Sequence, residues 1–173
     1  MNLVFYLSDH GFGHMSRNIS VIASVVRRYD ASVYIVCGKR QLEFAKDVLG
    51  TMLDEEQCSR IIYREEHTDG TLDVDAKKLA DACDMYVESV PERSHRESQW
   101  LKDNCIDAAL CDMPVWAIKA CDMAGVPMLY VGNFTWVELY REFLPDRITD
   151  VYEAYYKLIR HALVLPFHTE EML

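Results

Sequence analysis

Two histidines flank a glycine-containing segment near the start of the chain, in Asp9-His10-Gly11-Phe12-Gly13-His14. An imidazole titrates near neutral pH, so a histidine in an accessible turn can act as a general base. Glycine permits positive φ angles and lets a ligand approach the main chain closely. The segment therefore predicts a ligand-binding turn, and we expect the chemistry to be carried by His14.

The turn stands between a predicted strand and a predicted helix. An apolar run over 3–8 precedes it, and from Met15 the apolar residues recur with the spacing of an amphipathic helix. We expect a loop over 67–75 and a break or kink at Pro91 in the helical region 75–104. Further strands are predicted at 31–38, 60–65, 108–112, 127–132 and 161–166, and further helices at 40–49, 113–124, 134–142 and 149–160.

Alternating strands and helices predict an α/β fold, a Rossmann-like, doubly wound parallel sheet of about six strands in one domain, residues 1–173. The strands are continuously apolar, so we expect them to be buried on both faces. In the usual strand order 3-2-1-4-5-6, the first and fourth strands are neighbours. Ligands bind to such sheets beyond the carboxyl ends of the strands, which is where the glycine-containing turn is expected.

Asp112 ends the fourth predicted strand and should therefore lie close to His14. A carboxylate beside a histidine fixes its tautomer and raises its basicity. The two residues predict a pair that activates a hydroxyl without a protein nucleophile. An alternative is that Asp112 caps the helix that starts near Met113, and the two roles can coexist.

The rest of the turn is suited to a phosphate or another polar ligand. Gly11 and Gly13 expose the backbone, the helix N-terminus attracts anions, and Arg17 adds a cation. His10 either contributes to binding or only bonds to its own turn. His10 and His14 have the i, i+4 spacing of metal ligands, but glycines separate them and no third ligand follows, so we expect no metal.

Part of a dinucleotide-binding motif is present. Residues 11–16, GFGHMS, contain the first two glycines of G-x-G-x-x-G, whereas Ser16 occupies the third position. Lys39 and Arg40 follow the second strand, where they would suit the 2′-phosphate of NADP. An NADP-type Rossmann domain is therefore one alternative function, and a non-catalytic module that senses a sugar or nucleotide is another.

Composition restricts the partners and the compartment. The chain has 173 residues and a formal net charge of −10, so we expect it not to bind nucleic acid. No apolar run is long enough to span a membrane and no targeting segment is recognisable, which predicts a cytoplasmic protein without membrane insertion. The six cysteines form no C-x-x-C pair, so we expect reduced thiols.

Two blocks carry a family resemblance. Residues 8–21, SDHGFGHMSRNISV, resemble the motif H-G-F-G-H-[AS]-[ST]-R of bacterial glycosyltransferase-like proteins and of the N-terminal half of plant L-arabinokinases. The block 107–143 is similar in its Gly125-Val126-Pro127 turn and its Asn133-Phe134-Thr135-Trp136 segment. In the family an aspartate usually follows this tryptophan. Here Glu138 stands two residues after the tryptophan, and we expect it to complete a capping box with Thr135.

The resemblance implies the N-terminal, acceptor-side lobe of a GT-B-type glycosyltransferase, with a C-terminal lobe in the same protein. Such an enzyme moves a sugar from a nucleotide diphosphate sugar to an acceptor hydroxyl, without a metal or another cofactor, and the lobe alone should be inactive. His14 would be the base and Asp112 would orient it. Asn133 and Trp136 would bind the acceptor, because sugars bond to amides and stack on aromatic rings. Alternatively, Trp136 only packs its helix onto the core.

Overall fold

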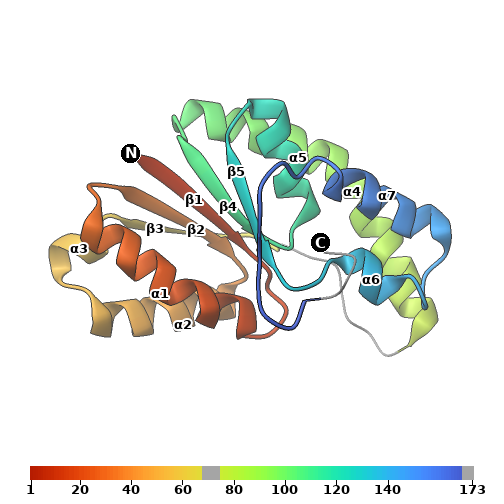
Figure 1. The fold of residues 1–173 in the computed structure, drawn as a ribbon, viewed down its shortest axis with the longest axis horizontal. Coiled ribbons are helices and arrows are strands. Elements are labelled where there is room, and N and C mark those ends of the chain that lie inside the picture. Colours follow the sequence, from red (N-terminus) through yellow and green to blue (C-terminus); the bar gives the residue numbers. More distant parts are fainter. Residues whose placement is uncertain (68–74, 169–173) are drawn as a thin grey trace.

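In the computed structural model, which describes residues 1–67 and 75–168, a parallel sheet forms the centre of the molecule (Figure 1). Its six strands have the order β3-β2-β1-β4-β5-β6, which confirms the prediction. The strands are β1 (Asn2–Leu7), β2 (Ser32–Cys37), β3 (Ile61–Glu65), β4 (Ala108–Asp112), β5 (Met128–Gly132) and β6 (Ala162–Val164). The helices are α1 (Gly13–Arg28), α2 (Lys39–Met52), α3 (Glu55–Ser59), α4 (Ala76–Asp103), α5 (Val115–Ala124), α6 (Trp136–Tyr140) and α7 (Asp146–Tyr156).

Helices cover both faces of the sheet, because alternate residues of each strand point to opposite sides. In β1, Phe5 and Leu7 pack with α1 and α2 in one core, whereas Val4 and Tyr6 pack with α4, α5, α6 and α7 in the other. Figure 1 shows these two helical layers on either side of the strands. The chain is therefore a doubly wound α/β domain.

The register of the central strands places two chain segments side by side. Leu7, the last residue of β1, pairs with Asp112, the last residue of β4. One residue further on, the backbone N–H of Ser8 donates to the carbonyl of Asp112 at 3.0 Å. The turn after β1 therefore begins directly beside the end of β4, so that side chains of α1 can reach the Asp112 carboxylate.

Three details differ from the sequence-based expectations. Helix α4 continues through Pro91 instead of breaking there, since the proline removes one backbone donor and the bonds on either side persist. The short helix α3, which was not predicted, is held by a capping box between Asp54 and Gln57. Strand β6 is not buried on both faces, because it is an edge strand and Leu163 is 52% exposed.

Most of the loop expected over 67–75 lies outside the described residues. Among the helices that are described, none has both the length and the apolar character needed to cross a membrane.

Candidate active site

The turn between β1 and α1 contains two glycines with different backbone conformations. Gly11 has a φ of +67°, a conformation that favours glycine. Gly13 is the first residue of α1 and has no positive φ, so a positive φ does not explain its presence. A Cβ on either residue would meet no atom within 4 Å. The main chain of the turn is therefore open to an approaching molecule.

Three side chains of α1 converge on one carboxylate. His14, Arg17 and Asn18 are spaced i, i+3 and i+4, so they share one face of the helix at its N-terminal end. This face is directed at Asp112, whose side chain is completely buried. His14 is 11% exposed and Arg17 is 27% exposed, so both lie at the border between core and solvent.

The Asp112 carboxylate accepts hydrogen bonds at both oxygens. Nδ1 of His14 lies 2.8 Å from Oδ1, and Nη2 of Arg17 donates to the same oxygen. Oδ2 accepts from Nε of Arg17 at 2.7 Å and from Nδ2 of Asn18 at 2.8 Å. Asn18 also donates to the carbonyl of His14 at 2.8 Å, which ties the first turn of α1 to β4.

These donors keep the carboxylate ionised. Burial alone would raise the pKa of Asp112, but the hydrogen bonds and charges of His14 and Arg17 outweigh it and lower the pKa below its ordinary value. An ionised carboxylate only accepts hydrogen bonds, so Nδ1 of His14 carries the proton in this contact. In the neutral ring, Nε2 is then unprotonated, and this is the tautomer that a general base needs.

Asp112 does not cap the helix that follows it, so that interpretation was wrong. Helix α5 begins only at Val115, after Pro114, and has no side-chain cap. Between the strand and the helix, Met113 takes a φ of +90°, which is unusual for a residue with a side chain. The hydroxyl of Tyr156 donates to the Met113 carbonyl at 3.0 Å, so a neighbouring helix supports the turn.

Arg17 also contacts the residue that directly follows β5. Its Nη1 donates to Oδ1 of Asn133 at 3.3 Å, and Asn133 directly follows β5. The guanidinium group thus joins α1, β4 and the segment after β5. The sequence predicted Arg17 and Asn133 as ligand-binding residues, whereas the structure places them in contact with each other beside Asp112.

His10 and Trp136 form a contact of their own. Their rings lie edge to face with centroids 5.1 Å apart, and the His10 backbone N–H donates to Oγ of Ser8 at 3.2 Å. Trp136 is only 2% exposed and also stacks on Tyr140. The packing role of Trp136 is therefore the one that the structure shows, and a sugar that stacked on this ring would have to displace a neighbouring side chain.

The predicted capping box is present at the start of α6. The side chain of Thr135 accepts from the backbone of Glu138, and the Glu138 carboxylate accepts from the Thr135 backbone N–H. Glu138 is thereby occupied as a helix cap, which accounts for its position after the tryptophan.

From the sequence, no role was assigned to Asn18 or to the turn between β2 and α2. Asn18 is a buried amide on the apolar face of α1, four residues after His14, and that placement was a usable signal. Nε2 of Gln41 donates to the carbonyls of Asp9 and Gly11 at 2.6 and 2.9 Å, so α2 holds the turn in place. A Cβ on Gly38 would lie 2.7 Å from Cβ of Asp9, which explains why a glycine stands there.

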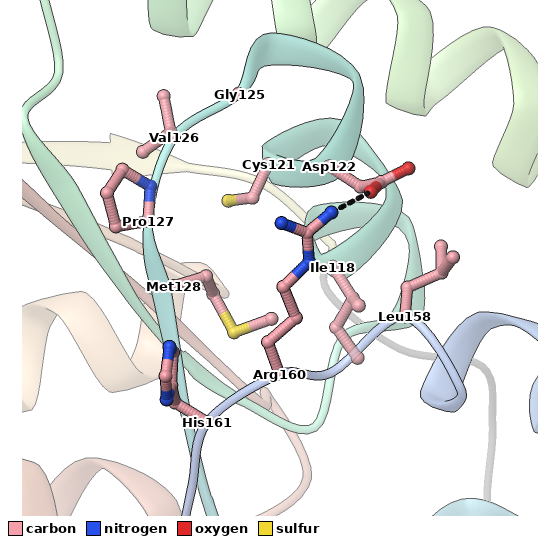
Figure 2. Close-up of a pocket in the computed structure, with 10 residues that line it drawn as sticks. All are labelled: Ile118, Cys121, Asp122, Gly125, Val126, Pro127, Met128, Leu158, Arg160 and His161. Carbon is pink, nitrogen blue, oxygen red and sulfur yellow. Dashed lines mark ion pairs between the residues drawn. The ribbon is translucent and has the colours of Figure 1, made fainter.

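A cavity of about 230 Å³ lies at the opposite end of the sheet, where α5 ends and β5 begins (Figure 2). Apolar side chains such as Ile118 and Leu158 line it, and Arg160 reaches over it to Asp122 at 3.9 Å. It contains none of the converging polar groups described above, so we place the candidate site at His14 and Asp112. Within the two described ranges, no cluster of three or more His, Cys, Asp or Glu residues could hold a metal ion.

Comparison with known proteins gives relatives of two kinds. L-arabinokinase of Arabidopsis thaliana is 28% identical over 148 residues, which are 81% of this chain and 13% of that protein. UGT2 of Phytolacca americana, solved with UDP-2-fluoro-glucose and pterostilbene, matches with a TM-score of 0.50 and 15% identity over 76% of this chain. A glycotransferase of kitacinnamycin matches with a TM-score of 0.53 and 16% identity over 90% of this chain. No protein-family model matches.

The fold is that of one Rossmann-like lobe of a GT-B glycosyltransferase. This confirms the fold class that the sequence predicted and agrees with the resemblance stated for its two motif blocks. The chain spans 30% and 38% of the two glycosyltransferase structures.

Proposed function

We propose that the chain is the acceptor-side lobe of a glycosyltransferase, which moves a sugar from a nucleotide diphosphate sugar to an acceptor hydroxyl. His14 is the general base and Asp112 orients it. Nε2 of His14 takes the proton of the hydroxyl, whose oxygen bonds to the anomeric carbon while the bond to the diphosphate breaks.

The observation that carries this proposal is the 2.8 Å contact between Nδ1 of His14 and the buried carboxylate of Asp112. The contact holds the ring with its basic nitrogen away from the carboxylate. Because α1 starts beside the end of β4, the pair lies at the carboxyl edge of the sheet, where ligands of such folds bind. In the part of the chain that the structure describes, the side chains that hydrogen-bond to Asp112 are an imidazole, a guanidinium and an amide, which favours direct attack by the acceptor.

The remaining parts of the active site belong to the same proposal. The open backbone at Gly11 and Gly13, together with the N-terminus of α1, faces the acceptor or the diphosphate. His10 and Asn133 border the acceptor. A second Rossmann-like lobe in the same protein holds the donor, and helix dipoles with basic side chains stabilise the leaving diphosphate without a metal. The six free thiols are in keeping with the cytoplasm as the compartment.

The test compares His14→Ala with His10→Ala in a protein that contains both lobes. We expect His14→Ala to lower kcat by roughly 10²–10⁴-fold, the usual contribution of a positioned general base. Donor affinity should change little, because the donor is held by the other lobe. His10→Ala should have the smaller effect on kcat. Turnover is measured against a panel of nucleotide diphosphate sugars.

Matched thermal stability is the control, since loss of a largely buried imidazole can also loosen the turn. Full kcat in His14→Ala together with its loss in His10→Ala would assign the base to the other histidine. Full kcat in both variants would remove the catalytic role of this turn.

A further inference from the structure

All three nitrogens of the Arg17 guanidinium group donate hydrogen bonds to other side chains of the protein. Its Nε and Nη2 donate to Asp112, its Nη1 donates to Asn133, and Nη2 also lies 2.9 Å from Nδ1 of His14. These contacts use the planar fork of donors in the way that suits a carboxylate best. Arg17 therefore acts on the site through Asp112 and His14.

The position of Arg17 has an electrostatic consequence for His14. A lone carboxylate at 2.8 Å would favour the protonated imidazole, which cannot accept a proton. The cation of Arg17 lies at a similar distance from the same ring nitrogen and opposes that effect. The two charges therefore act on the ring in opposite directions, and the carboxylate still orients it.

Other charged and titratable groups lie on the elements around the ring. In the described part of the chain, Asp112 of β4 and Arg17 of α1 are the charged side chains that contact the His14 ring. The segment after β5 contributes the uncharged Asn133, through Arg17. In the turn before α1, Asp9 and His10 are titratable: the Asp9 carboxylate lies 3.2 Å from Nδ1 of His67, and the His10 ring packs against Trp136.

We propose that Arg17 is a positioning residue that holds Asp112 in register with His14 and opposes the effect of the Asp112 charge on the imidazole ring. The inference rests on the proposed function for its catalytic meaning. It assigns Arg17 a different role from that of a free cation for the ligand. Asn18 assists by holding Oδ2 of Asp112 at 2.8 Å without adding charge.

The test follows the titration of the His14 ring by NMR in the 173-residue chain, which needs no substrate. Arg17→Gln removes the cation, so the midpoint of the His14 titration should move up by about one pH unit. Arg17→Lys keeps the charge without the fork, so its midpoint should move by less than half as much. Arg17→Met, which keeps an apolar stem, serves where the glutamine variant does not fold.

The matched control is Arg28→Gln, which removes the same charge from the other end of α1. Arg28 is exposed and lies about 16 Å along the helix from Arg17, beyond the Debye length of about 8 Å at physiological salt. We expect its His14 titration to match that of the unchanged chain. An unchanged or lowered midpoint in Arg17→Gln or Arg17→Met would overturn the proposal.

The two proposals fail separately. The titration reports the charge balance at His14 whether or not the protein transfers sugar, whereas His14→Ala reports catalysis. A raised midpoint in Arg17→Gln with full activity in His14→Ala would retain the role of Arg17 and remove the proposed function.

Discussion

At the scale of single residues, the unusual feature is a fully buried aspartate with hydrogen-bond donors at both oxygens. Burial of a charge is costly unless the charge is paired and hydrogen-bonded, and Asp112 meets both conditions through His14, Arg17 and Asn18. Removal of the carboxylate charge alone would leave Arg17 without its counter-ion. The group that orients the proposed base is therefore also important for stability.

We expect Asp112→Asn to lower the free energy of unfolding at neutral pH by about 1–3 kcal/mol, because donors at a buried site lose their acceptor. The loss should shrink at acid pH. The folded-state pKa of Asp112 lies below its ordinary value. The ionised carboxylate therefore contributes to the free energy of unfolding above the unfolded-state pKa, and this contribution disappears as pH falls through the folded-state pKa, below about 4.

Denaturant unfolding of the unchanged chain and of Asp112→Asn, from pH 7 to pH 3, measures this difference. The control is Asp47→Asn, an exposed position on α2, which should change stability by no more than about 0.5 kcal/mol at every pH. A difference between the chain and Asp112→Asn that stays constant over the whole range would contradict the assignment.

At the scale of secondary-structure elements, two neighbouring strand–helix turns support each other. The turn after β1 rests on the start of α2, where Gly38 contacts Asp9 and Gln41 bonds to two carbonyls of the turn. Since β1 and β2 are adjacent and parallel, both turns emerge at the same edge of the sheet. The position of His14 thus depends on packing between two loops as well as on its own helix.

Gly38→Ala should therefore be destabilising. The added Cβ would lie 2.7 Å from Cβ of Asp9 and 2.9 Å from Oε1 of Gln41, so the turn that carries the site must move. We expect a loss of about 1–3 kcal/mol in the free energy of unfolding, in the range of overpacking changes.

Gly50→Ala is the matched substitution for Gly38→Ala. Gly50 is exposed within α2, and a Cβ there meets no atom within 4 Å, so the change should stabilise the chain by about 0.5–1 kcal/mol. Thermal unfolding of the two variants measures both values. Equal stability of the two would show that the close approach at Gly38 is not important for folding.

At the scale of the whole molecule, the extent of the chain decides what it should do alone. It spans 13% of L-arabinokinase and 30–38% of the two glycosyltransferase structures. On the proposed function, the donor is held by another lobe, so the catalytic histidine of this lobe has no bound sugar nucleotide to act on.

We expect the 173-residue chain by itself to show no appreciable sugar transfer with any nucleotide diphosphate sugar, because on the proposed function another lobe holds the donor. Turnover is measured for the chain and for a protein in which it is joined to a donor-binding lobe. Robust turnover by the chain alone would contradict the two-lobed architecture. Tight binding of NADP by the chain would favour the alternative of a dinucleotide-binding domain.

The sequence alone was sufficient to predict the order of the sheet and the contact between His14 and Asp112. Strands buried on both faces give nearly continuous apolar runs, and right-handed crossovers leave few ways to order such strands. Once β1 and β4 were placed side by side, the residues at their carboxyl ends had to lie close together. The capping box between Thr135 and Glu138 could also be predicted from the sequence, because it needs only two residues three positions apart.

Tertiary structure alone decided which partners each polar side chain would have. In the sequence, Asp112 could equally have capped the next helix or oriented His14. In the structure, the turn at Met113 has a positive φ and α5 starts only at Val115, so Asp112 orients His14 and does not cap the helix. Arg17 looked like a free cation until its contacts with Asp112 and Asn133 were visible. The spacing of apolar residues in the sequence predicts which face of a helix or strand is buried. Hydrogen bonds between side chains about a hundred residues apart depend on side-chain rotamers and strand register, which only the packed fold determines.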